Sequence, residues 1–155
     1  MSGVHEATVE WRTGEGEPFL TRNYSRAHRW TFDGGAEVHA SSSPSVVRVP
    51  LSDPTGVDPE EALVAALSSC HMLTFLALAS NKGFVVDSYE DAAVGHLEKN
   101  ASGKLAITRV ELHPKIVYSG AKQPAAADLD WLHDKAHKEC FIANSVTTEV
   151  KVITT

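Results

Sequence analysis

Two cysteines, Cys70 and Cys140, are the side chains of this 155-residue chain best suited to covalent chemistry. Only a thiolate is a good nucleophile, so such chemistry needs a cation close to one of the sulfurs. The arginines that could supply that cation all lie far from Cys70 in the sequence, at Arg22, Arg26, Arg29 and Arg48. Without a cation, a buried Cys70 would be an inert, small hydrophobic side chain, which is its simplest interpretation.

The two cysteines are expected to have different environments. Cys70 lies in the middle of an apolar helical segment, whereas Cys140 ends a second helical segment. This pattern suits a peroxidatic cysteine, which is oxidised to a sulfenic acid, and a resolving cysteine, which condenses with that acid to give a disulfide. A disulfide scaffold is disfavoured, because two cysteines are too few to build one.

Metal binding is a competing interpretation of the second cysteine. His133, His137 and Cys140 follow an i, i+4, i+7 spacing on one helix face, and Cys70-His71 would complete a set of four ligands. Exposed histidines are common on amphipathic helices, so a solvated face is the simpler explanation. We therefore predict neither a metal nor any other cofactor. A Cys/His hydrolase is also disfavoured, because no nucleophile-elbow motif surrounds either cysteine.

Composition limits the class of protein. Hydrophobic residues make up 43% and charged residues 22% of the chain, which is ordinary for a globular protein, and the length fits one domain over residues 1–155. The net charge of −6, with no run of Lys or Arg, disfavours nucleic acid as a partner. Residues 1–12 do not resemble a signal peptide. Residues 62–81 lack charge but carry polar residues at their centre, so we expect no membrane span and a cytoplasmic protein.

A long helix is expected to position Cys70. Asp58 can cap it, Pro59 suits its first position, Glu61 completes a capping box, and Gly83 can end it. Such a helix has about 24 residues and a length of about 36 Å. Because it is apolar nearly all round, it should be buried on most sides, and a second subunit is expected to help cover it.

The remaining segments predict strands around that helix. Two short strands flank the turn Asp33-Gly34-Gly35, and a second helix over residues 125–139 leads to Cys140. The strand-like runs cover residues 4–12, 29–32, 36–40, 84–97, 104–118 and 145–153. The order β-β-β-α-β-β-α-β favours an α+β fold with largely antiparallel sheets.

Several segments resemble the OsmC/Ohr family, named after osmotically inducible protein C and organic hydroperoxide resistance protein. The run DPEEALVAALSSCHMLTF resembles the family's central helix, in which a Pro-Glu-Glu/Gln start precedes an Ala-rich stretch that ends in the reactive cysteine. AHKECFIANSVTTEVKV resembles the second cysteine region and closing strand, and GFVVDSYEDAAVGHLEK with AITRVELHPKIVYSG resembles the middle hairpin. YSRAHRWTFDGG resembles the N-terminal stretch of an OsmC-like subgroup.

The resemblance implies a role for each candidate residue. Cys70 matches the peroxidatic cysteine, Cys140 the resolving cysteine, and Glu60 the family glutamate ten residues before the reactive cysteine. The family also uses an arginine that pairs with this glutamate and stabilises the thiolate. Arg26, within the subgroup motif, and Arg48, nearer to the arginine of the OsmC branch, are the two candidates, and Arg26 is favoured. A glutamate near a helix N-terminus is also favourable without any catalytic role.

Helix geometry constrains how Glu60 could act. Ten residues of α-helix place it about 15 Å from Cys70 along the axis, which is too far for direct contact. Glu60 would therefore act on the partner subunit's Cys70, or orient the arginine that does.

The resemblance also implies a function: a thiol-dependent peroxidase that reduces organic hydroperoxides in the oxidative stress response. The implied assembly is an intertwined homodimer of an OsmC-like α+β fold, with antiparallel sheets around a long buried central helix and sites at the interface. The expected partners are an organic hydroperoxide and an external dithiol reductant, either a lipoyl protein or a thioredoxin-like protein. We expect Trp30, Phe75 and Phe141 to bury the alkyl part of the peroxide. The alternative is an OsmC-like protein that binds a small ligand or senses redox state without significant peroxidase activity. His71, directly after Cys70, departs from the family pattern.

Overall fold

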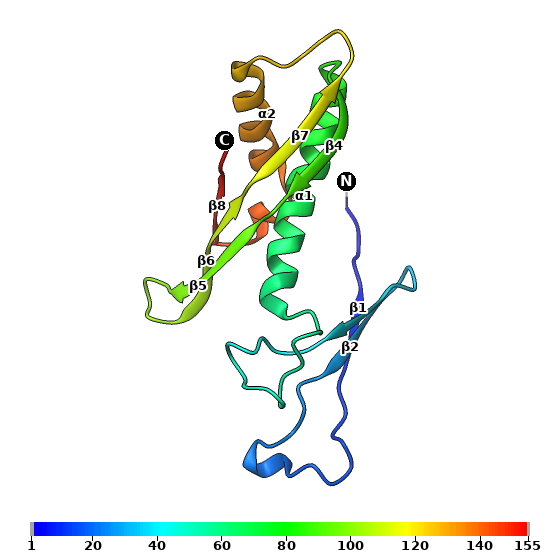
Figure 1. The fold of residues 1–155 in the computed structure, drawn as a ribbon, viewed down its shortest axis with the longest axis vertical. Helices are drawn as coiled ribbons and strands as arrows, with labels where there is room; N and C mark the ends of the chain where they lie inside the picture. The colour runs from blue at the N-terminus through cyan, green and yellow to red at the C-terminus, as the bar shows by residue number, and fades with distance from the viewer. Residues whose placement is uncertain (1, 155) are drawn as a thin grey trace. The chain divides into compact units, whose positions relative to one another are not determined.

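The computed structural model describes residues 2–154, and the chain divides into two compact units, Met1–Ala62 and Leu63–Thr155. A single domain over residues 1–155 stays a prediction. The elements, labelled in Figure 1 where there is room, are β1 (Ala7–Glu10), η1 (Phe19–Thr21), β2 (His28–Phe32), β3 (Glu37–Ala40), α1 (Pro59–Asn81), β4 (Val85–Asp91), β5 (Val94–Lys99), β6 (Leu105–Leu112), β7 (Pro114–Ser119), α2 (Ala126–Glu139), η2 (Ala143–Ser145) and β8 (Glu149–Val152).

The first unit is built on an antiparallel sheet with the order β1-β2-β3. The predicted Asp-Gly-Gly turn joins β2 to β3, and Gly35 has a φ of +85°, which a glycine adopts without strain. Residues 41–57 then run without helix or strand until Val57 pairs with Ala40 in an isolated parallel bridge. The first strand is shorter than its alternating pattern predicted, because only Ala7–Glu10 pair with β2.

Both predicted ends of α1 are confirmed. The backbone N–H of Glu61 donates to the Asp58 carboxylate at 2.7 Å, and the N–H of Asp58 donates back to the Glu61 carboxylate at 3.2 Å. These two bonds satisfy N–H groups that a helix start leaves unpaired. At the other end Gly83 has a φ of +78°, and the N–H of Phe84 donates to the carbonyl of Ala79 at 3.0 Å. This is the Schellman closure that the glycine predicted.

The second unit differs from the expected pair of long strands. Each predicted run is divided, so that β4 pairs with β7 in one sheet, and β5, β6 and β8 form another. Asp91 sits at the division: its carboxylate accepts the N–H of His113 at 2.6 Å and the hydroxyl of Ser68 at 2.5 Å. These long-range bonds hold the chain where it passes from one sheet to the other. Most pairs are antiparallel as predicted, whereas β8 runs parallel to β6.

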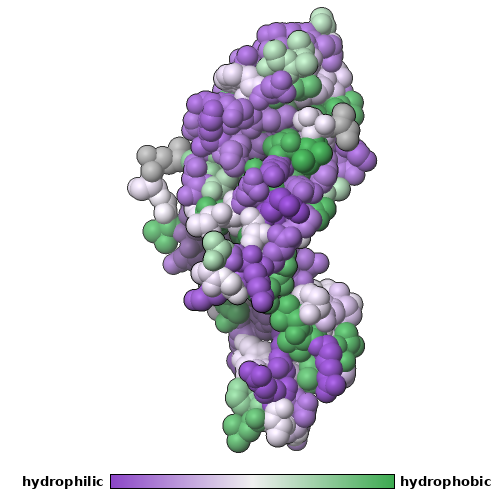
Figure 2. Space-filling model, turned by 90° about the vertical axis from the view of Figure 1, so that its left-hand side faces the viewer, coloured by the Kyte–Doolittle hydropathy of each residue, from purple (hydrophilic) through white to green (hydrophobic). Residues whose placement is uncertain are grey.

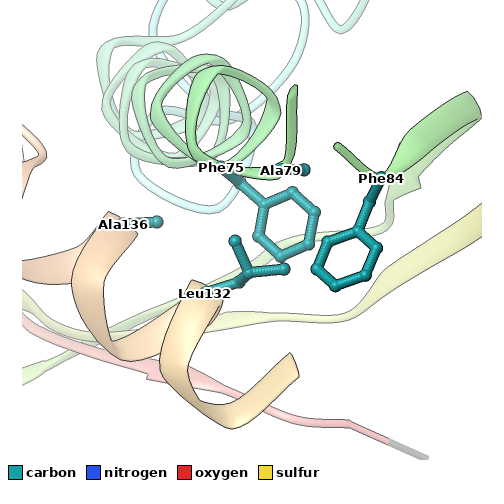
Figure 3. Packing of buried hydrophobic residues seen from close by; sticks show 5 residues of the cluster. All are labelled: Phe75, Ala79, Phe84, Leu132 and Ala136. Carbon is teal, nitrogen blue, oxygen red and sulfur yellow. The ribbon is translucent and has the colours of Figure 1, made fainter. Parts of the chain in front are cut away.

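Two hydrophobic clusters fix α1 against these sheets. Near its C-terminal end, Phe75 and Ala79 pack with Phe84 and with Leu132 and Ala136 of α2, as Figure 3 shows. Nearer its start, Leu67 packs with buried residues of β6 and with partly buried residues of η2 and β8. The helix therefore spans both sheets of the second unit and carries the cysteine segment between the two clusters.

The single chain covers α1 on one side only, so its expected burial on most sides depends on the predicted second subunit and stays a prediction. Its buried residues form one stripe, Leu67, His71, Phe75 and Ala79, whereas Leu73 is 61% exposed. The sheets and α2 of the second unit cover only one side of the helix. By length and composition α1 could cross a membrane, and 22% of its most apolar window is buried. A core helix meets the same criterion, and the packed stripe is what a core helix would show.

The second helix presents a polar side to solvent. The exposed positions of α2 include Asp130, Asp134, Lys138 and Glu139, and Lys138 pairs with Asp134 at 2.6 Å. Figure 2 shows the side of the molecule from which α2 is seen, where hydrophilic residues predominate around smaller hydrophobic patches. The buried side of α2, by contrast, faces α1 and its cysteine.

Candidate functional site

The structure brings the two cysteines together although 70 residues separate them in the sequence. Cys70 lies mid-way along α1, and Cys140 is the residue that caps α2 at its C-terminus. Both thiols are free, and Cys70 is close enough to affect the titration of Cys140. The packing of α2 on α1 is what creates this neighbourhood, since Leu132 and Ala136 precede Cys140 on the packed face of the helix.

Cys70, which the sequence predicted to be buried, is the less buried of the two thiols. Cys70 is half-buried, because it lies beside the buried stripe of α1, whereas Cys140 is only 1% exposed. Burial, and then the neighbouring thiol of Cys70, raise the pKa of the Cys140 thiol. The Cys140 sulfur also accepts the N–H of Ala143 at 3.4 Å, a weaker effect in the opposite direction. Cys140 is therefore held as a protonated thiol, while Cys70 is the more accessible sulfur.

A buried pair of histidines lies next to the cysteine segment. The Nε2 of His71 lies 3.1 Å from the Nδ1 of His133, and the two rings stack with their planes 9° apart. Burial and the neighbouring imidazoles lower the pKa of His71 from 6.5 to about 4, and burial also lowers the pKa of His133. His71 and His133 are thus neutral, hydrogen-bonded core residues at neutral pH. This corrects the solvated helix face expected for His133.

The alternative ligand set does not converge on a metal site. Within residues 2–154, no group of three or more histidine, cysteine or acidic side chains is placed to hold an ion. Instead, His133 is bonded to His71 and packs against Phe75 with ring centroids 4.6 Å apart. The i, i+4, i+7 spacing on α2 thus reflects the helix face that packs on α1 rather than coordination.

Two of the other predicted site residues, Arg26 and Glu60, line one pocket within the first unit. This pocket has a volume of about 510 Å³, and Trp11, Phe19 and Tyr24 also line it. Glu60 lies in the first turn of α1, where its charge is favoured by the helix dipole. Neither Arg26 nor Glu60 forms an ion pair among residues 2–154, so the described part of the chain leaves both charges available to a ligand.

Local contacts fix the position of the Arg26 side chain. Its Nη1 donates to the carbonyls of Arg22, at 3.0 Å, and of Tyr24, and its guanidinium carbon lies 3.7 Å from the centre of the Tyr24 ring. Its backbone N–H donates to the carbonyl of Leu51 at 2.8 Å. Arg48, the other candidate, is exposed and does not line this pocket. The structure therefore brings Glu60 together with Arg26 and not with Arg48.

The aromatic residues expected to receive a substrate are not those that line the pocket. Phe75 belongs to the core between α1 and α2, Phe141 is 72% exposed, and Trp30 lies in β2 outside the pocket lining. Sequence reasoning missed the pocket residues Trp11, Phe19 and Tyr24. Trp11 lies in the predicted strand over residues 4–12, whereas the other two lie in a segment without helix or strand periodicity. The available signal was composition: three of the chain's 11 aromatic residues fall within residues 11–24, just before Arg26.

Comparison with protein families settles the relationship of the chain. The family model described as OsmC-like protein matches residues 52–155, which is more than half of the chain. The chain belongs to the OsmC-like family. The predicted OsmC/Ohr resemblance and the α+β fold of helices and largely antiparallel sheets are thereby confirmed. The search of curated proteins finds no match.

Solved structures of OsmC-like proteins extend this comparison. An OsmC-like protein of unknown function from Vibrio cholerae is 51% identical, with a TM-score of 0.97 over 99% of this chain and 100% of that one. An organic hydroperoxide resistance protein from Elizabethkingia anophelis is 18% identical, with a TM-score of 0.72 over 100% and 97% of the two chains. The organic hydroperoxide resistance protein OhrB of Bacillus subtilis is 17% identical, with a TM-score of 0.65 over 99% and 98%. The last two comparisons show the shared fold.

The range matched by the family model begins after the aromatic residues of the pocket. The aromatic residues of the pocket and Arg26 all precede residue 52, whereas Glu60 and both cysteines lie within the matched range. The range matched by the family model thus carries both thiols, whereas residues before it supply most of the pocket.

Proposed function

We propose that this OsmC-like protein is a thiol-dependent peroxidase that reduces organic hydroperoxides through Cys70. The observation that carries the proposal is the neighbourhood of the two cysteines: a half-buried thiol on α1 beside a buried thiol at the end of α2. Structural cysteines need no such partner, whereas a peroxidatic thiol needs a resolving thiol within reach. The structural similarity to the organic hydroperoxide resistance proteins of Elizabethkingia anophelis and Bacillus subtilis supports the same activity.

The proposed reaction has three steps. The Cys70 thiolate attacks the distal peroxide oxygen, so that an S–O bond forms, the O–O bond breaks, and the alkoxide leaves as an alcohol after taking up a proton. The Cys140 sulfur then attacks the Cys70 sulfenic acid, so that an S–S bond forms and the hydroxyl leaves as water. An external dithiol reduces this disulfide by thiol exchange and becomes a disulfide itself. The raised pKa of Cys140 suits the second role, because the thiol stays protonated until its neighbour has been oxidised.

A cation is needed to hold Cys70 as the thiolate, and we assign that role to Arg26, with Glu60 as the residue that orients it. The assignment rests on their common pocket and on the absence of an ion-pair partner for either within residues 2–154. Because α1 is continuous from Pro59 to Asn81, Glu60 and Cys70 of one chain are about 15 Å apart along its axis. We therefore propose a homodimer in which each subunit supplies Arg26 and Glu60 to the partner subunit's Cys70. The exposed side of α1, where Leu73 is 61% exposed, supports such a dimer.

The remaining predicted partners belong to the same proposal. We propose an organic hydroperoxide as the substrate, a lipoyl or thioredoxin-like dithiol as the reductant, and the cytoplasm, where such reductants keep thiols reduced, as the location. An organic substrate is favoured over hydrogen peroxide because most of the accessible surface of the pocket wall is apolar.

The proposal is tested by stopped-flow measurement of cumene hydroperoxide consumption by the reduced protein. We expect a rapid burst of one peroxide per subunit, and a loss of two hydrogens in the mass of each subunit, as the disulfide forms. Cys70→Ser should abolish the burst. Cys140→Ser should keep it but leave a sulfenic acid that a dimedone label captures. Arg26→Gln should slow the burst at neutral pH, whereas the matched control Arg48→Gln should not.

Two outcomes would contradict this function. Equal peroxide consumption by the unaltered protein and by Cys70→Ser would remove Cys70 from any peroxidase role. Slow overoxidation of one sulfur without a disulfide would favour the alternative, an OsmC-like protein that binds a ligand in the pocket without turnover. Analytical ultracentrifugation tests the dimer separately, and a monomer at micromolar concentration would refute the shared site.

A further inference from the structure

A wall of three aromatic rings lines the pocket that holds Arg26. Phe19 stacks on Tyr24 with ring centroids 4.6 Å apart and planes at 27°. Trp11 meets Tyr24 edge-on at 5.4 Å and lies 5.8 Å from Phe19. Each ring therefore contacts both of the others, and the three are held as one unit.

Hydrogen bonds hold the residues of this aromatic wall in position. The Trp11 indole N–H donates to the carbonyl of Ser25 at 2.8 Å, which satisfies its only polar atom. The Glu17 carboxylate accepts the N–H of Ser25 at 3.1 Å and that of Gly14 at 3.0 Å. These bonds link the beginning and the middle of the segment from Trp11 to Arg26 to its end. A preorganised wall loses little entropy when a ligand binds.

The wall continues directly into the charged part of the pocket. The Arg26 guanidinium lies over the Tyr24 ring at 3.7 Å, so one side chain, Tyr24, contacts both Phe19 and the cation. Phe19 is 48% exposed, so about half of its side chain is not packed in the core and can contact a ligand. A ligand that touches the guanidinium with a polar group can thus lay an apolar body against the rings.

We infer that the aromatic wall of Trp11, Phe19 and Tyr24 selects hydroperoxides whose peroxide-bearing carbon carries a flat aryl group. The inference rests on the proposed function and specifies its substrate class. Aryl groups gain from offset or edge-on contact with aromatic rings in addition to the burial of apolar area, whereas branched or linear alkyl groups gain from burial alone. Hydrogen peroxide gains from neither. The expected preference is aryl-alkyl, then alkyl, then hydrogen peroxide.

The test uses Phe19→Leu, which keeps an apolar side chain but removes the ring at a half-exposed position where folding is little affected. Steady-state kinetics are measured with cumene hydroperoxide and with tert-butyl hydroperoxide. We expect the KM for cumene hydroperoxide to rise about threefold to tenfold, with kcat retained, and the KM for tert-butyl hydroperoxide to change less than about twofold. The matched control is Leu20→Ala, because Leu20 is the next residue, is 95% exposed and does not line the pocket.

A binding measurement separates failure of the wall from failure of the peroxidase. Calorimetric titration of the Cys70→Ser protein with cumyl alcohol, the product of cumene hydroperoxide reduction, needs no turnover. Binding that Phe19→Leu weakens supports the wall even if the protein proves not to be a peroxidase. If Phe19→Leu changes both peroxides equally or neither, or if cumyl alcohol does not bind, the inference is overturned while Cys70 chemistry can still stand.

Discussion

The buried histidine pair makes the stability of the protein depend on pH in a defined way. His71 is 1% exposed, and burial lowers its pKa from 6.5 to about 4. Between these pH values the unfolded chain binds a proton that the folded chain excludes, so the free energy of unfolding falls as the pH falls. The loss attributable to His71 is about 2 kcal/mol between pH 8 and pH 5, and approaches about 3 kcal/mol below pH 4.

The perturbation that tests this is His71→Gln, which retains a polar side chain next to His133 but cannot titrate. Urea unfolding at pH 8 and at pH 5 should show that the variant loses about 2 kcal/mol less than the unaltered protein between the two pH values. The contribution of His133, whose pKa is also lowered, stays in both proteins and cancels in the difference. His5→Gln, at an exposed position outside the helices and strands, is the matched control and should leave the pH dependence in place.

A second measurement keeps the reasoning testable if His71→Gln does not fold. NMR titration of the imidazole resonances follows His71 directly in the unaltered protein. The groups that act on the pair are known: His137 on α2 disfavours the charged form of His71, while Asp130 and Asp91 favour that of His133. A His71 ring that titrates near pH 6.5, or an equal loss of stability in both proteins, would refute burial as the controlling effect.

Four further predictions follow from packing, capping and burial. Asp58→Ala removes one half of the capping box and should lower the free energy of unfolding by about 1 kcal/mol in urea titration. Leu132→Ala leaves a cavity between the helices, and a loss of about 2–5 kcal/mol is expected from thermal or urea unfolding. At Gly95 a Cβ would overlap the Cγ2 methyl of Val64, so Gly95→Ala should cost about 1–3 kcal/mol, with little loss speaking against the close approach of β5 to α1. Iodoacetamide followed by mass spectrometry should label Cys70 well before Cys140, since the latter is buried and its thiol pKa is raised.

The features that could be predicted from the sequence are those that short segments determine. The capping box of Asp58 and Glu61 and the glycine that ends α1 act within a few residues, so they gave the bounds of the helix closely. The turn at Asp33-Gly34-Gly35 is equally local. The division of the long strands was missed, because it depends on Asp91, whose partners Ser68 and His113 lie on other elements.

In the site, too, local features could be predicted from the sequence, whereas features that depend on long-range contacts could not. Mid-helix and helix-end positions for Cys70 and Cys140 follow from periodicity, but their burial depends on which face of α1 meets α2. The sequence could propose both Arg26 and Arg48, and only the folded loop places one of them with Glu60. The aromatic wall was missed because Trp11, near the end of a predicted strand, contacts Phe19 and Tyr24 of the irregular segment that follows. In that segment no periodic pattern marks which side chains will meet.

The different burial of the two thiols determines the order of the proposed reaction. An exposed resolving cysteine with an ordinary pKa would compete for peroxide and be oxidised in its own right. Cys140 is both inaccessible to solvent and held protonated, so it is a poor nucleophile towards a diffusing peroxide. It becomes effective only towards a sulfur that is already beside it, and that sulfur is electrophilic only after Cys70 has been oxidised. The sequence predicted burial for Cys70, but the structure buries Cys140, the proposed resolving cysteine. This burial is what would confine oxidation to Cys70 and direct it into a disulfide.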